Sequence, residues 1–224
     1  AIYGTRNVPV AGNLRVEGTT LKFIPSQPWL YGMKYRVTLL PELKDLQGNR
    51  LEARYEWSFE TRTLAPGMVP IWPGSFVMGS PRKPPEREVT MSQIYYILNH
   101  EVTVGEYRLC MEAVACIYSE PNESRHWTMK NPDRVDAPLN YISWDQAQEY
   151  TRWLSRQYPG DYRLCTEAEW EYAARAEGQG RFGCGTEVKC LNQHAWHSRN
   201  LYQPGPQPVQ RKQPNTWGLF DMQG

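Results

Sequence analysis

The chain has 224 residues, of which 40% are apolar and 22% charged, and its formal net charge is +1. This length allows one large domain or two modest ones, and the composition is close to that of an ordinary soluble protein. Basic and acidic residues are interleaved, which gives no electrostatic case for binding nucleic acid or an anionic membrane. The chain has no run of about 18 apolar residues, so the sequence predicts no membrane span.

Residues 1–62 predict β structure. Polar and apolar residues alternate over 34–39 and 55–60, as in strands with one buried face, and 21–24 reads as a third short strand. Prolines and a glycine then cluster over 63–73, which predicts a short linker.

Three helix starts follow, each marked by a capping box, in which the first and fourth residues satisfy each other's backbone amides. They are Thr103-x-x-Glu106, Ser143-x-x-Gln146 and Thr166-x-x-Glu169. Three tryptophans near these segments are expected to anchor the core: Trp144, Trp170 and Trp217. Beyond about residue 178 the sequence predicts no regular element.

Four of the five cysteines form two closely spaced pairs, Cys110 with Cys116 and Cys184 with Cys190. Two short disulfide loops are the natural interpretation, and they would imply an oxidising, extracytoplasmic compartment. The alternative is that all five cysteines are buried free thiols. Cys165 has no neighbour of its own type in either case.

Residues 1–62 resemble part of a bacterial Ig-like domain. The resemblance is carried by LKFIP at 21–25, LYGMKYRVT at 30–38, KDLQGN at 44–49 and WSFET at 57–61. A complete sandwich of this type has about 100 residues. The resemblance therefore implies a partial domain whose first strands lie upstream of Ala1, with the role of a spacer.

Residues 74–224 resemble the formylglycine-generating enzyme, or sulfatase-modifying factor, family. Five blocks occur in the order of that family: GSFVMGS at 74–80, NHEVTVGEY at 99–107, APLNYISWDQA at 137–147, YRLCTEAEWEYAAR at 162–175 and NTWGLFDMQG at 215–224. The resemblance implies an α+β fold, a variant of the C-type lectin fold with much irregular structure, that is incomplete at its C-terminus.

The resemblance also implies an activity, the oxidation of a substrate cysteine to formylglycine by a copper(I) ion held between two cysteines. In the family that cysteine pair lies beyond the fifth block, and none of the five cysteines here matches it. We therefore expect no catalytic or cofactor-binding residue in this chain, and Cys165 stands where the family has proline. The parent protein would act on a protein or peptide, or alternatively serve as a non-catalytic binding or structural module for a surface ligand.

Members of the family commonly bind structural calcium. By resemblance, the side chain of Asp221 and the carbonyl of Gly224 would belong to one calcium site. The side chain of Asn200 and the carbonyl of Leu201 would belong to a second, although Asn200 also suits an ordinary turn.

Overall fold

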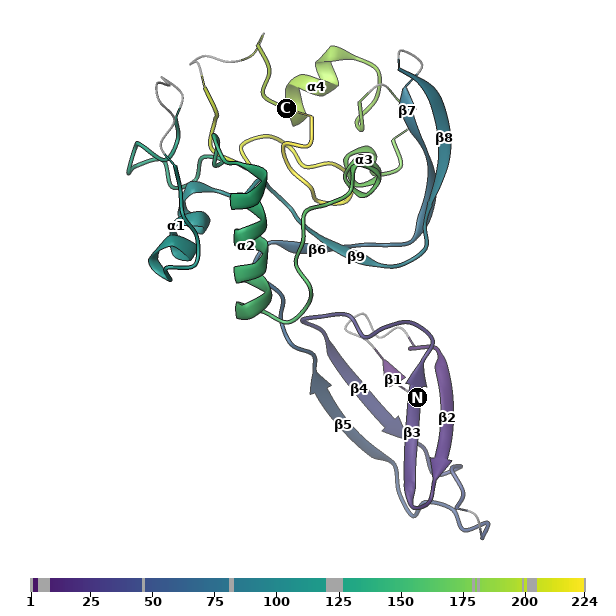
Figure 1. The fold of residues 1–224 in the computed structure, drawn as a ribbon. Coiled ribbons are helices and arrows are strands. Elements are labelled where there is room, and N and C mark those ends of the chain that lie inside the picture. The colour runs from purple at the N-terminus through teal and green to yellow at the C-terminus, as the bar shows by residue number, and fades with distance from the viewer. Residues whose placement is uncertain are drawn as a thin grey trace. The chain divides into compact units, whose positions relative to one another are not determined.

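The computed structural model describes residues 2–3, 9–45, 47–80, 83–119, 127–178, 180, 182–198, 200 and 205–223. It divides into two compact units, Ala1–Leu64 and Ala65–Gly224. Both contain small antiparallel sheets, and the described helices all belong to the second unit (Figure 1).

The first unit is built from two small sheets. One has the order β1-β4-β5 and the other is the hairpin β2–β3. The strands are β1 (Ile2–Tyr3), β2 (Gly12–Glu17), β3 (Thr20–Pro25), β4 (Lys34–Leu39) and β5 (Tyr55–Glu60). The three strands expected from the sequence are therefore confirmed, and β1 and β2 are additional.

Alternation in β4 gives the first unit its core. Tyr35 and Val37 are buried, while the alternating residues Lys34 and Arg36 are exposed. Trp29 packs edge-on against Tyr35, with ring centroids 4.7 Å apart. Strand β2 lacks such a pattern, because all six of its residues are exposed.

The second unit contains two antiparallel strand pairs, β6–β9 and β7–β8. Their bounds are β6 (Met68–Ile71), β7 (Gly74–Ser80), β8 (Lys83–Met91) and β9 (Tyr95–Leu98). Strand β6 lies inside the segment 63–73 that the sequence predicts as a linker, so the segment is not a linker along its whole length. Ile71 is 1% exposed, and its burial holds this proline-rich stretch in the fold.

Helices α1 (Val104–Glu112), α2 (Trp144–Gln157) and α3 (Glu167–Arg175) begin where the sequence predicts. All three capping boxes form, with both reciprocal hydrogen bonds present. Helix α4 (Val188–His194) was not expected: its N-cap Glu187 makes no side-chain cap bond, so the usual sequence signal is missing.

Two cores lie in the second unit. Around α3 the buried residues are Ile71, Ile97, Tyr172, Ala173 and Leu219. Between α1 and α2 they are Tyr107, Cys110, Cys116 and Tyr150. In Figure 1, α3 lies within the curve of the β7–β8 hairpin, and α1 and α2 lie together on the other side.

The expected tryptophan anchors are only partly confirmed. Trp217 packs against the core around α3. Trp144 is 65% exposed and Trp170 is 47% exposed, so the prediction is wrong for both. Each lies in the first turn of its helix or directly after it, where the core does not cover the ring.

Both expected disulfides are present, Cys110–Cys116 and Cys184–Cys190, and Cys165 is a free thiol. The result is a mixed α+β unit with small sheets and long ordered loops. No helix in the described part of the chain is long and apolar enough to cross a membrane.

The two disulfides offer a matched comparison of stability. Both join residues six apart, so each contributes about 2 kcal/mol in the chain-entropy model. Cys110 is fully buried, whereas Cys184 is exposed. Replacing Cys110 and Cys116 by alanine should therefore cost about 1–2 kcal/mol more than replacing Cys184 and Cys190, because it also empties packed volume. Urea unfolding followed by tryptophan fluorescence measures both, and equal losses would contradict the role of burial.

Candidate functional site

The start of α3 is the most strongly fixed polar feature of the second unit. Glu169 accepts hydrogen bonds from the Thr166 amide and hydroxyl at 2.8 and 3.0 Å. Arg163 pairs with the same carboxylate at 2.5 and 2.8 Å. The pKa of Glu169 is lowered to about 2, mainly by the hydrogen bonds from the Arg163 guanidinium. This helix start is therefore a charged structural clamp.

Cys165 lies between these charged residues, directly before the helix. Its side chain is exposed, yet the surrounding protein desolvates the thiolate, and this burial raises the pKa of Cys165, with Glu169 adding to the effect. A thiol that resists ionisation is a poor nucleophile and metal ligand.

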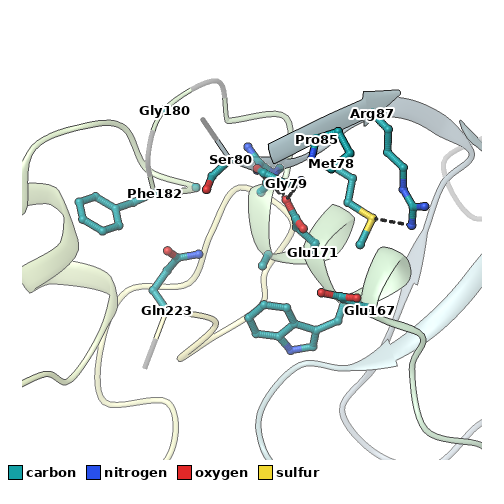
Figure 2. Close-up of a pocket in the computed structure, with 14 residues that line it drawn as sticks. Met78, Gly79, Ser80, Pro85, Arg87, Glu167, Glu171, Gly180, Phe182 and Gln223 are labelled. Atoms are coloured by element: carbon teal, nitrogen blue, oxygen red, sulfur yellow. Dashed lines mark hydrogen bonds and ion pairs between the residues drawn. The ribbon is translucent and has the colours of Figure 1, made fainter. Parts of the chain in front are cut away.

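A groove of about 530 Å³ lies between the β7–β8 hairpin and α3. Figure 2 shows Met78 and Arg87 on the hairpin, Glu167 and Glu171 on the helix side, and Phe182 and Gln223 from later loops. Arg87 donates to the Met78 sulfur at 3.7 Å. The lining combines aromatic, cationic, anionic and amide side chains.

One ionic network fixes the shape of this groove. The Glu171 carboxylate accepts a hydrogen bond from the Gly79 amide at 2.9 Å. It also accepts two hydrogen bonds from the Arg175 guanidinium, at 2.9 and 2.6 Å. Arg175 also donates to the Gly79 carbonyl at 2.5 Å. Gly79 has φ of 101°, a conformation that favours glycine. The hairpin is therefore locked to α3, and the groove offers polar recognition with no activated nucleophile among its described lining residues.

A larger open cavity of about 1030 Å³ lies in the region bounded by α1, α2 and the end of β9. Its walls are mostly apolar, with members that include Leu98, Val102, Leu139, Ile142, Trp153 and Leu154. Its ionisable lining residues include several tyrosines and, besides them, His100, Glu101, Glu106, Arg163, Cys165 and Asp221.

Asp221 is the most unusual of these side chains. It is 8% exposed, and its backbone has φ of 57°. Oδ2 accepts a hydrogen bond from the Gln210 amide at 2.8 Å, but Oδ1 is buried and has no hydrogen-bond partner among the described residues. Burial raises the pKa of Asp221, opposed by the Gln210 bond and the charges of His100 and Lys212.

Glu101 also lines this cavity. Solvent reaches its side chain, although enough protein surrounds it that burial raises the pKa of Glu101, with the Asp221 charge adding to the shift. His100 is directed elsewhere, because its Nε2 contacts Glu106 Oε1 at 3.2 Å. In the described ranges, no lysine or arginine nitrogen forms an ion pair with Glu101 or Asp221.

The residues expected to bind calcium are only partly described. Leu201 and Gly224 lie outside the described residues. Asn200 Oδ1 accepts the His197 amide at 2.8 Å, and its Nδ2 donates to the Ala195 carbonyl at 2.9 Å, which is the behaviour of a turn asparagine. Within the described part of the chain, no three His, Cys, Asp or Glu side chains group as a metal site. The electrostatic effect of Asp221 on Glu101 was not expected, because 120 positions separate them in the sequence.

Comparison with known proteins identifies both units. Residues 55–224 match the family model described as sulfatase-modifying factor enzyme 1-like domain, and residues 2–61 match the bacterial Ig-like domain model. The chain is 34% identical over 102 residues to the formylglycine-generating enzyme of Mycobacterium tuberculosis, covering 41% of this chain and 32% of that protein. It is 28% identical over 101 residues to the inactive C-alpha-formylglycine-generating enzyme 2 of Mus musculus, covering 41% and 31%.

A solved structure, that of PvdO from Pseudomonas aeruginosa, is similar with a TM-score of 0.56 and 25% identity. The similarity covers 69% of this chain and 66% of that one. The chain spans about a third of the length of these two curated relatives, and 13% to 35% of the length of the others that it matches.

The α3 clamp predicts a pH-dependent loss of stability. Replacing Glu169 with glutamine keeps the capping box but removes the charge paired with Arg163, and should lower the free energy of unfolding at pH 7 by about 1 kcal/mol. Because the pKa of Glu169 is lowered to about 2 in the folded chain, its contribution is present above pH 4.5 and disappears as the pH falls towards 2.

The matched control is Glu167→Gln, which removes an exposed carboxylate from the same helical turn. Thermal unfolding from pH 7 to pH 2 should show the difference between Glu169→Gln and the unmodified chain shrinking, with little effect of the control. A difference that stays constant across this range would show that the ion pair is not its cause.

Proposed function

Because the chain belongs to the sulfatase-modifying factor, or formylglycine-generating enzyme, family, we propose that its parent protein oxidises a cysteine of a protein or peptide substrate to formylglycine. The observation that carries the proposal is the family match over residues 55–224. The formylglycine-generating enzymes among its relatives support the same reaction, although the chain spans only about a third of their length.

We propose further that the 224-residue chain does not perform this reaction by itself. Copper(I) in this family needs two thiolates, and the described residues do not fit that requirement. Four cysteines are held in disulfides, which cannot ligate copper, and Cys165 is a single thiol whose pKa is raised. The catalytic ligands would have to come from residues outside this sequence.

The second candidate function is recognition without catalysis. The groove between the β7–β8 hairpin and α3 supports it, because its rigid polar network presents Glu167 and Arg87 beside the half-exposed ring of Trp170. One relative is an enzyme named as inactive, so the family includes such members. A peptide or another polar surface ligand would suit this lining.

For the architecture, we propose a C-type-lectin-like arrangement for the second unit and an Ig-like sandwich for the complete form of the first. The domain assignment is 1–62 for the partial Ig-like domain and 74–224 for the enzyme-family domain. The two disulfides support an extracytoplasmic location, since such bonds persist in oxidising compartments.

Structural calcium remains part of the proposal through Asp221 with Gly224 and Asn200 with Leu201. The free Oδ1 of Asp221 supports it, since calcium takes six to eight oxygen ligands. Asn200 supports it less, because its amide already makes two hydrogen bonds. The described residues fit calcium poorly without further ligands, and we assign the ion no role in the reaction.

A direct assay tests whether the 224-residue chain alone is inactive. Incubated with copper(I), oxygen and a Cys-x-Pro-x-Arg peptide, the 224-residue chain should leave the peptide mass unchanged. The physical reason is that one weakly acidic thiol cannot form a two-thiolate copper site.

The control variant is Cys165→Ala, which should behave in the same way. Mass spectrometry that finds chain-dependent conversion of the peptide cysteine, abolished by Cys165→Ala, would place the chemistry at that residue and refute the proposal. The parent protein, assayed in parallel, should convert the peptide; failure there would favour the recognition function.

A further inference from the structure

Strand β5 is an open edge of the larger sheet in the first unit (Figure 1). The sheet has the order β1-β4-β5, so β5 pairs with β4 on one side and with no described strand on the other. The Thr61 amide, directly after β5, donates to the Met33 carbonyl at 2.9 Å and so points towards β4. Amide directions alternate along a strand, and those of Glu56, Ser58 and Glu60 therefore point to the open edge.

The usual protection of an edge strand is missing from β5. Natural proteins blunt exposed edges with lysine, proline, bulges or very short strands. Strand β5 is six residues long, its sequence YEWSFE has neither lysine nor proline, and its register with β4 is continuous. Such an edge is suited to pairing with a further strand.

One face of this edge strand is aromatic and only partly covered. Tyr55, Trp57 and Phe59 lie on the same face, because side chains alternate along a strand. Phe59 stacks on Tyr35 in the core of the unit, with ring centroids 5.4 Å apart. Tyr55 is 50% exposed and Trp57 is 49% exposed. The aromatic face therefore continues out of the core along β5, where a neighbouring strand would cover it.

We propose that the first unit is a dimerisation module, in which β5 pairs antiparallel with β5 of a second copy of this chain. A two-fold axis makes such an interface self-complementary, since each contact occurs twice. With the axis at Trp57, Tyr55 lies opposite Phe59 of the second copy, and the two aromatic faces join into one. The outward amides of Glu56 and Ser58 then lie opposite each other and exchange hydrogen bonds.

The charges along β5 select this register. Two registers overlap the strands most fully and keep the aromatic faces on one side, one centred on Trp57 and the other on Ser58. Centred on Ser58, each Glu56 lies opposite a Glu60, and like charges directly opposite are destabilising. Centred on Trp57, Glu56 lies opposite Ser58, and Arg54 lies opposite Glu60. An opposite-charge pair thus stands at each end of the interface.

The ion pairs within one copy do not oppose this arrangement. Arg54 contacts Glu56 at 2.5 Å and Lys34 contacts Glu60 at 3.7 Å, and all four side chains are exposed. Exposed pairs contribute little to stability, so they rearrange at small cost. The interface uses one strand from each copy, which makes it small and the dimer dependent on protein concentration.

A strand of the Ig-like domain from upstream of Ala1 is the competing occupant of this edge. The self-complementary order of charges favours a second copy. Arg54 and Glu60 stand at equal distances from Trp57 in the sequence, so each meets its opposite charge only when the strand pairs with itself about that residue.

Sedimentation equilibrium of the 224-residue chain measures the association. The average mass should rise from that of a monomer towards that of a dimer between about 1 µM and about 300 µM protein, as for a small interface. Arg54→Glu and Glu60→Arg each put like charges opposite each other at both ends, and each should weaken the dimer about fivefold or more. The matched control is Lys22→Glu, which reverses an exposed charge on β3 and should leave the association unchanged.

The chain that carries both Arg54→Glu and Glu60→Arg gives the sharpest comparison. It restores opposite charges between the copies, and its dimer should regain the strength of the unmodified one. Within each copy, the contacts with Glu56 and Lys34 stay reversed in this variant. Recovery can therefore come only from contact between copies.

Cross-linking tests the register. In a Cys165→Ala background, Trp57→Cys should give a disulfide-linked dimer on oxidation, because the two residues on the axis face each other within disulfide range. Ser58→Cys should give none, since each Ser58 lies opposite Glu56. Gel electrophoresis without reductant separates the two results.

A chain that stays monomeric at about 300 µM would overturn the proposal, as would a dimer that ignores both charge reversals or cross-links through Ser58→Cys instead of Trp57→Cys. A parent protein that stays monomeric where the 224-residue chain dimerises would assign the edge to an upstream strand instead. Circular dichroism identifies any variant that fails to fold, and the mass of the unmodified chain needs no variant. All these measurements concern the first unit, so failure here is separate from failure of the proposed function.

Discussion

Helix α3 is the element on which the second unit depends, because separate segments of that unit attach to its backbone and side chains. Its first turn is closed by the capping box, and its buried face forms part of the larger core. Two hydrogen bonds tie strands to the helix: the Tyr95 hydroxyl donates to the Glu169 carbonyl, and the Gly79 amide donates to the Glu171 carboxylate. Two more tie loops to it: the Tyr172 hydroxyl donates to the Trp72 carbonyl, and the Asn215 side-chain amide donates to the Ala173 carbonyl. Both strand pairs and the C-terminal loop are therefore positioned by one nine-residue helix.

This arrangement also explains which parts of the fold could be predicted from the sequence. Capping boxes join residues three apart, and each disulfide joins residues six apart. Because both interactions are local, they could be predicted from the sequence. Strand β6 was missed because its stability comes from the distant partner β9 and not from its own proline-rich composition. The exposure of Trp170 was missed because helical spacing identifies a face without showing how far the core extends.

The candidate site was harder to predict than the fold. The family resemblance pointed to Asp221, but its partner Gln210, the unsatisfied oxygen and the effect of its charge on Glu101 all depend on tertiary structure. Two further features could not be read from the sequence: Gln210 and Asp221 both adopt positive φ, of 60° and 57°, without being glycine. Non-glycine residues are held in this conformation only when their surroundings compensate for it.

The two hollows of the second unit differ in one physical respect that separates their roles. In the groove beside α3, Glu171 is balanced by Arg175 and the Gly79 amide, so the network is complete and adds rigidity. In the larger cavity, Asp221 keeps an Oδ1 acceptor with no hydrogen-bond partner among the described residues. A complete network gains little from a ligand except surface contacts, whereas an unsatisfied carboxylate gains a charged hydrogen bond as soon as a donor arrives. The larger cavity is therefore where binding would most change the stability of this unit.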